Sequence, residues 1–242
     1  MSSKGVRLKE VKAEIRRLEN PSKAKFLQRF FKTGKGEYAE GDIFLGITVP
    51  VSRSIAKKFS GLSIDDSFSL LKSKFHEERL IALFIITRHF EKSTMELKKE
   101  IIDKYLAHTK YINNWDLVDS SAYKIFGKYL LNKPKDILLE LAKSSMLWER
   151  RIAMVSTYAF IKEKETSPTF QLALLLMNDN EDLMHKAVGW MLREAGKPDP
   201  VGLDIFLTEN YKKMPRTMLR YAIEKFPEKK RKAFLTGKIE SN

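Results

Sequence analysis

Hydrophobic residues recur every three to four positions along almost the whole chain, and no window sustains a strict alternation of apolar and polar residues. The first pattern predicts amphipathic α-helices, whereas a sustained alternation would have indicated strands. The periodic segments predict helices at residues 9–18, 22–32, 51–59, 64–74, 76–91, 94–108, 114–131, 134–144, 147–162, 168–177, 181–195, 200–213 and 215–226, and a short one from 227. The sequence therefore predicts an all-α fold of antiparallel helices joined by short loops.

Polar helix starts recur along the chain at His76, Trp115, Trp148 and Met184, which are 39, 33 and 36 residues apart. A period near 40 residues, with two helices in each repeat, indicates HEAT-like repeats. Such repeats stack into a solenoid whose inner helices line a concave surface suited to an extended partner. We therefore predict a HEAT-like, armadillo-type α-solenoid, formed as a single domain over residues 1–242 with its core at about 9–237 and short flexible termini.

One long loop, residues 33–42, interrupts the helices and contains three glycines. It is not a nucleotide-binding P-loop, because no Gly-Lys-Ser/Thr follows at the required spacing. Two interpretations stay open, an ordinary connection and a backbone nest for one DNA phosphate.

The segment Asn-Asn-Trp-Asp-Leu-Val-Asp-Ser-Ser, residues 113–121, lies at the middle of the chain. In a helix, Trp115 and Asp119 are four positions apart and share one face, while the apolar residues that follow face elsewhere. A carboxylate beside an indole, on a face that the core does not use, is a candidate functional site. The alternative is that Trp115 belongs to the core and that Asp119 caps a neighbouring helix.

A second unusual face lies in the predicted helix 181–195. Lys186, Trp190 and Arg193 stand at positions i, i+4 and i+7 and form one stripe, separate from the apolar stripe of Met184, Val188, Met191, Leu192 and Ala195. Gly189 is unfavourable within a helix by roughly 1 kcal/mol, so its presence predicts close approach of another backbone. Trp190 is either a functional aromatic among cations or a core residue flanked by solvated charges.

A third candidate is Trp-Glu-Arg-Arg at residues 148–151. Trp148 and Arg151 are three positions apart and share a helical face. An arginine at the start of an inner helix can bind a phosphate with both arms of its guanidinium. The alternative is a salt bridge from Arg151 to Glu149 or to a neighbouring helix.

The charge of the chain favours a polyanionic partner. The net charge is +14, with 23 Lys and Arg against 16 Asp and Glu in residues 1–120, and 22 against 15 in residues 121–242. The excess is therefore spread along the scaffold, which predicts a basic groove and, most simply, a nucleic acid partner. A basic surface without a partner remains the alternative.

Several function classes are excluded by composition. Cysteine is absent, which excludes disulfides, thiolate metal sites and a cysteine nucleophile. The four histidines are isolated, and the His-Glu-Glu-Arg-Leu segment from His76 is not a zinc-binding His-Glu-x-x-His. We therefore expect no metal and no cofactor. No apolar run approaches the ~20 residues of a membrane span, and the first residues lack the apolar segment of a signal peptide, so a cytoplasmic protein without membrane contact is expected.

Three segments together resemble the AlkD-like DNA alkylation repair family. They are Asn-Trp-Asp-Leu-Val-Asp from Asn114, Trp-Glu-Arg-Arg from Trp148, and His-Lys-Ala-Val-Gly-Trp-Met-Leu-Arg-Glu from His185. The segment Phe-Leu-Gly-Ile from Phe44, followed by Pro50, is similar to the family's N-terminal part. The resemblance runs from about residue 10 to residue 230.

The resemblance implies a DNA glycosylase that removes N3- and N7-alkylated purines from duplex DNA by hydrolysing the N-glycosidic bond. It implies that Asp119 is the catalytic aspartate, that Trp115 and Trp190 are the site tryptophans, and that Arg151 and Arg193 contact DNA. We add Lys186 and Trp148 to the expected DNA-binding residues, assign Asp116 to structure, and expect a monomer. Two alternatives remain: a non-catalytic HEAT-repeat binder of damaged or branched DNA, and a scaffold for a protein partner.

Overall fold

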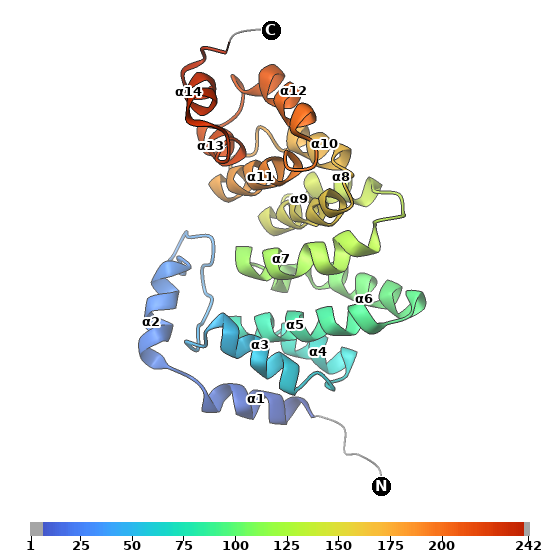
Figure 1. Ribbon diagram of the computed structural model, residues 1–242. Coiled ribbons are helices and arrows are strands. Elements are labelled where there is room, and N and C mark those ends of the chain that lie inside the picture. The colour runs from blue at the N-terminus through green and yellow to red at the C-terminus, as the bar shows by residue number, and fades with distance from the viewer. Residues whose placement is uncertain (1–6, 240–242) are drawn as a thin grey trace. The chain divides into compact units, whose positions relative to one another are not determined.

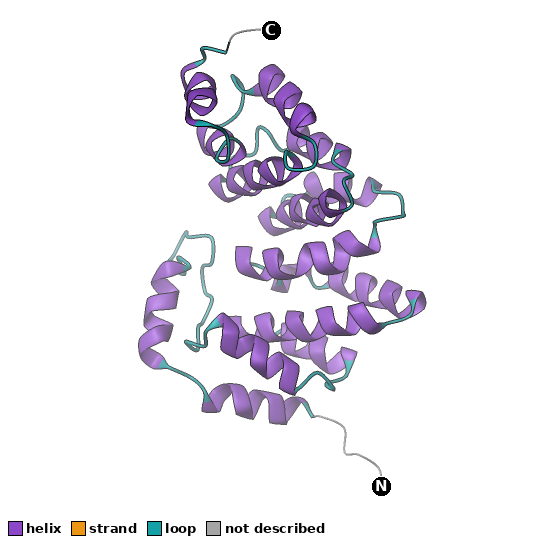
Figure 2. Cartoon of the chain, in the orientation of Figure 1, coloured by secondary structure: helices purple, strands orange, loops and turns teal. Residues whose placement is uncertain are grey.

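The structure is a computed structural model that describes residues 7–239. Every regular element within these residues is helical (Figure 2), which confirms the predicted all-α class. The chain divides into two compact units, residues 1–121 (unit 1) and 122–242 (unit 2). Whether they form the single domain predicted from the sequence depends on how the two units are joined, and the single domain stays a prediction. The flexible termini were expected before about residue 9 and after about residue 237, and residues 1–6 and 240–242 of them lie outside the described residues.

Unit 1 is built around helix α5 (Figure 1). Its helices are α1 Leu8–Arg17, α2 Pro21–Phe30, α3 Val49–Lys58, α4 Ile64–Leu71, α5 His76–Lys92, α6 Met95–Ala107, a 3₁₀ turn Thr109–Tyr111, and α7 Trp115–Ala122, whose last residue begins unit 2. Helix α5 packs against α3, α4 and α6. The apolar run from Leu80 to Ile86 is buried on every side, as expected of a helix that is hydrophobic all round.

Helix α2 differs from the rest of unit 1 because none of its residues is buried. The N-terminus of α2 is stabilised in two ways. Pro21 occupies its first turn, and the Asn20 side chain accepts a hydrogen bond from the Lys23 backbone N–H. Its apolar stripe, however, is exposed, with 60% of Phe26 and 55% of Phe30 accessible to solvent. The α2 aromatics are therefore held at the surface of unit 1.

Unit 2 is built around helices α9 and α11 (Figure 1). Its elements are a π-helical turn Tyr123–Gly127 that continues α7, then α8 Asp136–Ala142, α9 Leu147–Lys162, α10 Ser167–Leu175, α11 Asp182–Ala195, α12 Pro200–Asn210, α13 Arg216–Ala222 and α14 Glu228–Thr236. Helix α9 packs against α8, α10, α11 and the π turn, and α11 packs against α13. The predicted apolar stripe of α11 is completely buried.

Gly189 is where α11 and α13 meet most closely. A Cβ atom placed on Gly189 would lie 2.4 Å from the Met218 carbonyl oxygen and 2.5 Å from Tyr221 Cβ. Real Cβ atoms do not approach other atoms this closely, so only glycine allows this packing. The prediction of a close backbone approach at Gly189 is confirmed.

Candidate functional site

Trp115 is the first residue of α7, and its backbone is fixed by the residue before it. The buried Asn114 side chain accepts a hydrogen bond from the Trp115 backbone N–H at 2.8 Å, and the Asn114 carbonyl accepts one from Val118 at 3.1 Å. The second bond is the first turn of the helix. Trp115 and Asp119 are both half-buried and are one turn apart on this short helix, so they share a face as predicted.

The indole of Trp115 contacts three aromatic residues that precede α3 in the chain. The Phe31 ring stacks on it with centroids 5.2 Å apart and planes at 19°, and the Phe30 ring meets it edge-on at 6.2 Å. The indole N–H donates to the Tyr38 hydroxyl at 3.3 Å. Tyr38 lies in the glycine-containing loop 33–42, so this loop supplies a contact to the candidate site. The sequence offered no signal for this role.

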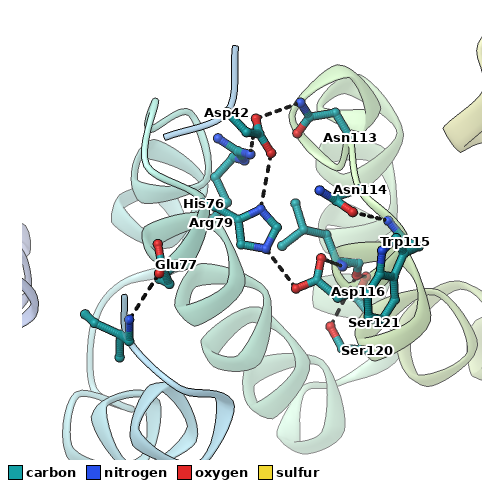
Figure 3. A network of polar contacts seen from close by, with 12 residues as sticks. Asp42, His76, Glu77, Arg79, Asn113, Asn114, Trp115, Asp116, Ser120 and Ser121 are labelled. Atoms are coloured by element: carbon teal, nitrogen blue, oxygen red, sulfur yellow. Dashed lines mark hydrogen bonds and ion pairs between the residues drawn. The ribbon is translucent and has the colours of Figure 1, made fainter. Parts of the chain in front are cut away.

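A buried histidine ties the same loop to α7 (Figure 3). His76 opens α5, and its ring nitrogens face two carboxylates: Nδ1 lies 3.2 Å from Asp42, and Nε2 lies 2.8 Å from Asp116. Asp42 also accepts hydrogen bonds from Arg79 at 2.7 Å and from Asn113 at 3.2 Å. The assignment of Asp116 to structure is supported by these contacts, because its second oxygen also accepts the Leu117 N–H at 2.9 Å.

The charges of this network set its titration. Burial lowers the pKa of His76, but the charge and hydrogen bond of Asp116, together with the hydrogen bond to Asp42, raise it to about 9. Burial raises the pKa of Asp42, but the His76 hydrogen bond and the Arg79 charge outweigh burial and lower it. His76 is therefore an imidazolium at neutral pH, and both of its ring nitrogens donate hydrogen bonds.

The residue after His76 holds a second segment of unit 1. The Glu77 carboxylate is buried and accepts hydrogen bonds from the backbone N–H groups of Leu45, Gly46 and Ile47, at 2.9, 2.8 and 3.1 Å. The buried Glu78 next to it pairs with Arg16 of α1 at 3.0 Å. The polar start of α5 is thus a structural centre of unit 1. The described residues contain no cluster suited to a metal ion.

Two predicted DNA-binding residues lie in α9 of unit 2 and are buried. Trp148 is 7% exposed and Arg151 is 5% exposed. The Arg151 guanidinium donates a hydrogen bond to the Leu183 carbonyl at 2.6 Å, and the Glu149 carboxylate accepts one from the Ser144 hydroxyl at 2.5 Å. Arg150, which the sequence analysis did not single out, forms a close ion pair with Asp179 at 2.6 Å.

The three predicted residues of α11 lie on its half-exposed side. Trp190 faces Tyr158 of α9, with ring centroids 6.1 Å apart. Lys186 pairs with Asp182 at 2.7 Å, and Arg193 pairs with Glu224 and, at 3.5 Å, with Glu194. The Lys186 hydrogen bond lowers the pKa of Asp182. Because α9 packs against α11, the two groups of predicted residues in unit 2 lie on neighbouring helices.

Comparison with known proteins identifies a family and a similar fold. Residues 11–226 match the family described as DNA alkylation repair enzyme. A solved structure described as a predicted DNA alkylation repair enzyme from Enterococcus faecalis is similar in fold, with a TM-score of 0.68, 17% sequence identity, and coverage of 87% of this chain and 97% of that chain. No curated protein matches the chain. No helix in the described residues is long and apolar enough to cross a membrane. The family match covers most of the sequence, and the chain therefore belongs to the family of DNA alkylation repair enzymes.

Proposed function

We propose that this chain is a DNA glycosylase that hydrolyses the N-glycosidic bond of cationic N3- and N7-alkylated purines in duplex DNA. The observation that carries the proposal is that the two aspartates of α7 have different surroundings. Asp116 is bound by the buried His76, whereas Asp119 shares a half-exposed face with Trp115 one turn away. Family membership supplies the class of substrate, alkylated DNA.

The chemistry suits these residue types. An alkylated purine is a cation and a good leaving group, so the bond between the base nitrogen and C1′ can break without a strong general acid. The bonding electrons then leave with the base, which becomes neutral, and positive charge develops on the deoxyribose. Asp119 stabilises this charge and orients the water that adds to C1′, while the water's proton passes to the carboxylate or to solvent.

Trp115 and Trp190 are the proposed aromatic partners of the cationic base and sugar. The face of an indole attracts a cation by ~0.5–2 kcal/mol, depending on how far water is excluded. Phe31 stacks on Trp115 and fixes the plane that it presents. Arg151, Lys186, Arg193 and Trp148 are proposed to bind the DNA backbone. For Lys186 and Arg193 this requires exchange of a carboxylate partner for a phosphate. We further propose a monomer acting in the cytoplasm.

Release of free base is the direct test. DNA carrying 7-methylguanine is incubated with wild type, Asp119→Asn and Asp103→Asn, and the free base is measured by mass spectrometry. Asp103 is a matched control because it is an exposed aspartate of α6, paired with Lys99. Wild type and Asp103→Asn should release base at equal rates, and Asp119→Asn should be slower by about 100-fold or more.

The alternative of a non-catalytic DNA binder gives a different result. Wild type and Asp119→Asn would then both release base at the background rate while binding DNA equally. That outcome would contradict the proposed enzyme activity.

A further inference from the structure

Three half-exposed aromatic residues form a row across three elements of unit 2, in which the π turn packs against α9 and α9 packs against α11. Tyr123 lies in the π turn, Tyr158 in α9 and Trp190 in α11. The ring centroids of Tyr123 and Tyr158 are 5.2 Å apart, and those of Tyr158 and Trp190 are 6.1 Å apart. We call these three residues the aromatic row. Only Trp190 was singled out from the sequence.

A lysine lies over two rings of the row. Lys162 stands four residues after Tyr158 on α9, so both side chains point from the same face. Its ammonium group is 4.8 Å from the ring centroid of Tyr158 and 5.1 Å from that of Tyr123. Two such cation–π contacts restrict a side chain that is otherwise flexible. Lys162 is therefore a cation held at a defined place on the surface.

The charge of Lys162 is not neutralised by a carboxylate. Among the described residues, no ion pair involves Lys162, whereas Lys186 and Arg193 on α11 are both paired with acids. The aromatic rings offer only their electron-rich faces, which leave the positive charge in place. An anion arriving at unit 2 would find this ammonium oriented and available.

The backbone is specialised where the row begins. Tyr123 starts a π-helical turn, a rare conformation that is frequently found at functional sites. The turn ends at Gly127, where an added Cβ would lie 2.3 Å from the Ser156 carbonyl oxygen of α9. This close packing brings the turn against α9 and places Tyr123 beside Tyr158. The juxtaposition of the two tyrosines thus depends on the π turn and on a glycine.

The angles between the rings indicate which part of a nucleic acid they fit. The planes of Tyr123 and Tyr158 meet at 76°, and those of Tyr158 and Trp190 at 39°. Successive bases of a strand stack with parallel planes, so they could not lie on these rings together. The C–H faces of a deoxyribose have no such requirement, and its phosphate would reach the ammonium.

We infer that Lys162, Tyr158 and Tyr123 form a binding site for the sugar–phosphate backbone of DNA, in which Lys162 binds one phosphate and the two rings pack against the adjoining deoxyribose. This inference rests on the proposed function only in that the ligand is DNA. It does not require base release. It predicts binding that is independent of sequence and of alkylation.

The test is the salt dependence of binding to an unmodified 20-base-pair duplex, measured by fluorescence anisotropy. The variant is Lys162→Ala, and the matched control is Lys133→Ala, because Lys133 also lies over one tyrosine, Tyr129, at 4.8 Å, outside the row. One lost phosphate contact lowers the slope of log K against log salt by about 0.9. The ratio of the Kd of Lys162→Ala to that of wild type should therefore fall by roughly 3.5-fold between 50 and 200 mM salt, with no such change for Lys133→Ala.

The rings are tested separately from the charge. Tyr158→Phe keeps the ring and should bind like wild type, whereas Tyr158→Ala should bind about 2- to 5-fold more weakly. Tyr129→Ala is the control. Thermal melting of each variant shows whether a loss of binding comes from unfolding.

The outcomes separate this site from the proposed reaction. If Lys162→Ala keeps the wild-type slope and affinity while wild type binds DNA, the site is wrong and the proposed glycosylase stands. If Lys162→Ala lowers the slope but wild type releases no base, the site stands and the glycosylase is wrong. Failure of folded wild type to bind the duplex at 50 mM salt would overturn both.

Discussion

The Nε2 atom of His76 lies 2.8 Å from the carboxylate of Asp116, so the acidic residue directly after Trp115 is held by a buried imidazolium. The other ring nitrogen faces Asp42 at 3.2 Å, and Arg79 completes the charge balance around Asp42. This relationship separates two aspartates that are only three residues apart in sequence. Asp116 holds the start of α7 in place, and Asp119 is the proposed catalytic group.

The first prediction concerns stability at alkaline pH. The pKa of His76 is raised to about 9, above its ordinary value near 6.5, so the folded protein binds this proton more tightly than the unfolded chain does. The stabilisation is therefore complete below about pH 6.5 and is lost as pH rises through about 9. Its size is about 3 kcal/mol. Urea unfolding at pH 6, 7.5 and 9.5 measures it.

His76→Gln is the comparison for this prediction. Glutamine retains hydrogen bonding but cannot carry the charge, so the variant should lose most of the stability change between pH 6 and 9.5. Other groups that titrate near pH 10 remain in both proteins and cancel in the difference. A variant that follows the pH dependence of wild type would show that His76 is not the titrating group.

The second prediction concerns Glu77. In Glu77→Ala, three buried backbone N–H groups at residues 45–47 lose the carboxylate that accepts their hydrogen bonds. Leaving buried donors unsatisfied costs 1–3 kcal/mol each, so the free energy of unfolding should fall by about 3 kcal/mol or more. Glu77→Gln keeps one side-chain oxygen and should be intermediate. A urea midpoint for Glu77→Ala equal to that of wild type would contradict this role.

The third prediction concerns the sign of a glycine substitution. Alanine is preferred over glycine in a helix interior by about 1 kcal/mol, so helix propensity alone predicts that Gly189→Ala is stabilising. The contact with the Met218 carbonyl predicts the opposite, because the added Cβ would force α11 and α13 apart. We expect destabilisation by about 1–3 kcal/mol, measured by urea unfolding. A more stable variant would mean that the two helices separate without loss.

The fourth prediction concerns the two indoles and base release. Phenylalanine keeps an aromatic face but attracts cations less strongly than tryptophan. Trp115→Phe and Trp190→Phe should each slow release of 7-methylguanine by about 2- to 30-fold, and the alanine variants should be slower still. Single-turnover rates with excess protein isolate the chemical step. Equal rates for the phenylalanine and alanine variants would show that the aromatic face plays no part.

The helices and their buried faces were predictable because they depend on local periodicity. The helix expected at residues 147–162 has the same bounds in the structure, and the apolar stripes of α7 and α11 are buried as expected. Gly189 was informative because its cost in a helix requires compensation by packing. These features follow from neighbours within a few turns of each other.

The surroundings of the candidate site were not predictable in the same way. Tyr38 and Trp115 are 77 residues apart in sequence, and His76 and Asp116 are 40 apart. No periodic pattern records pairings over such distances, because they arise from how helices pack. The π turn at Tyr123 was also missed, since its sequence continues the helical pattern of α7 without a break. The position of Lys162 over the aromatic row depends both on the packing of helices distant in sequence and on the π turn.

Helix α2 has no buried side chain, and this has a consequence for how unit 1 opens. Amide hydrogens exchange with solvent first where few apolar contacts hold an element, and last in the core. We expect the amides of α2 to exchange far faster than those of α5, whose apolar run is enclosed on every side. Phe30, which contacts Trp115 edge-on, therefore lies in a helix that unfolds locally more readily than the core of unit 1. Its ring can adjust to an incoming ligand while the core stays folded.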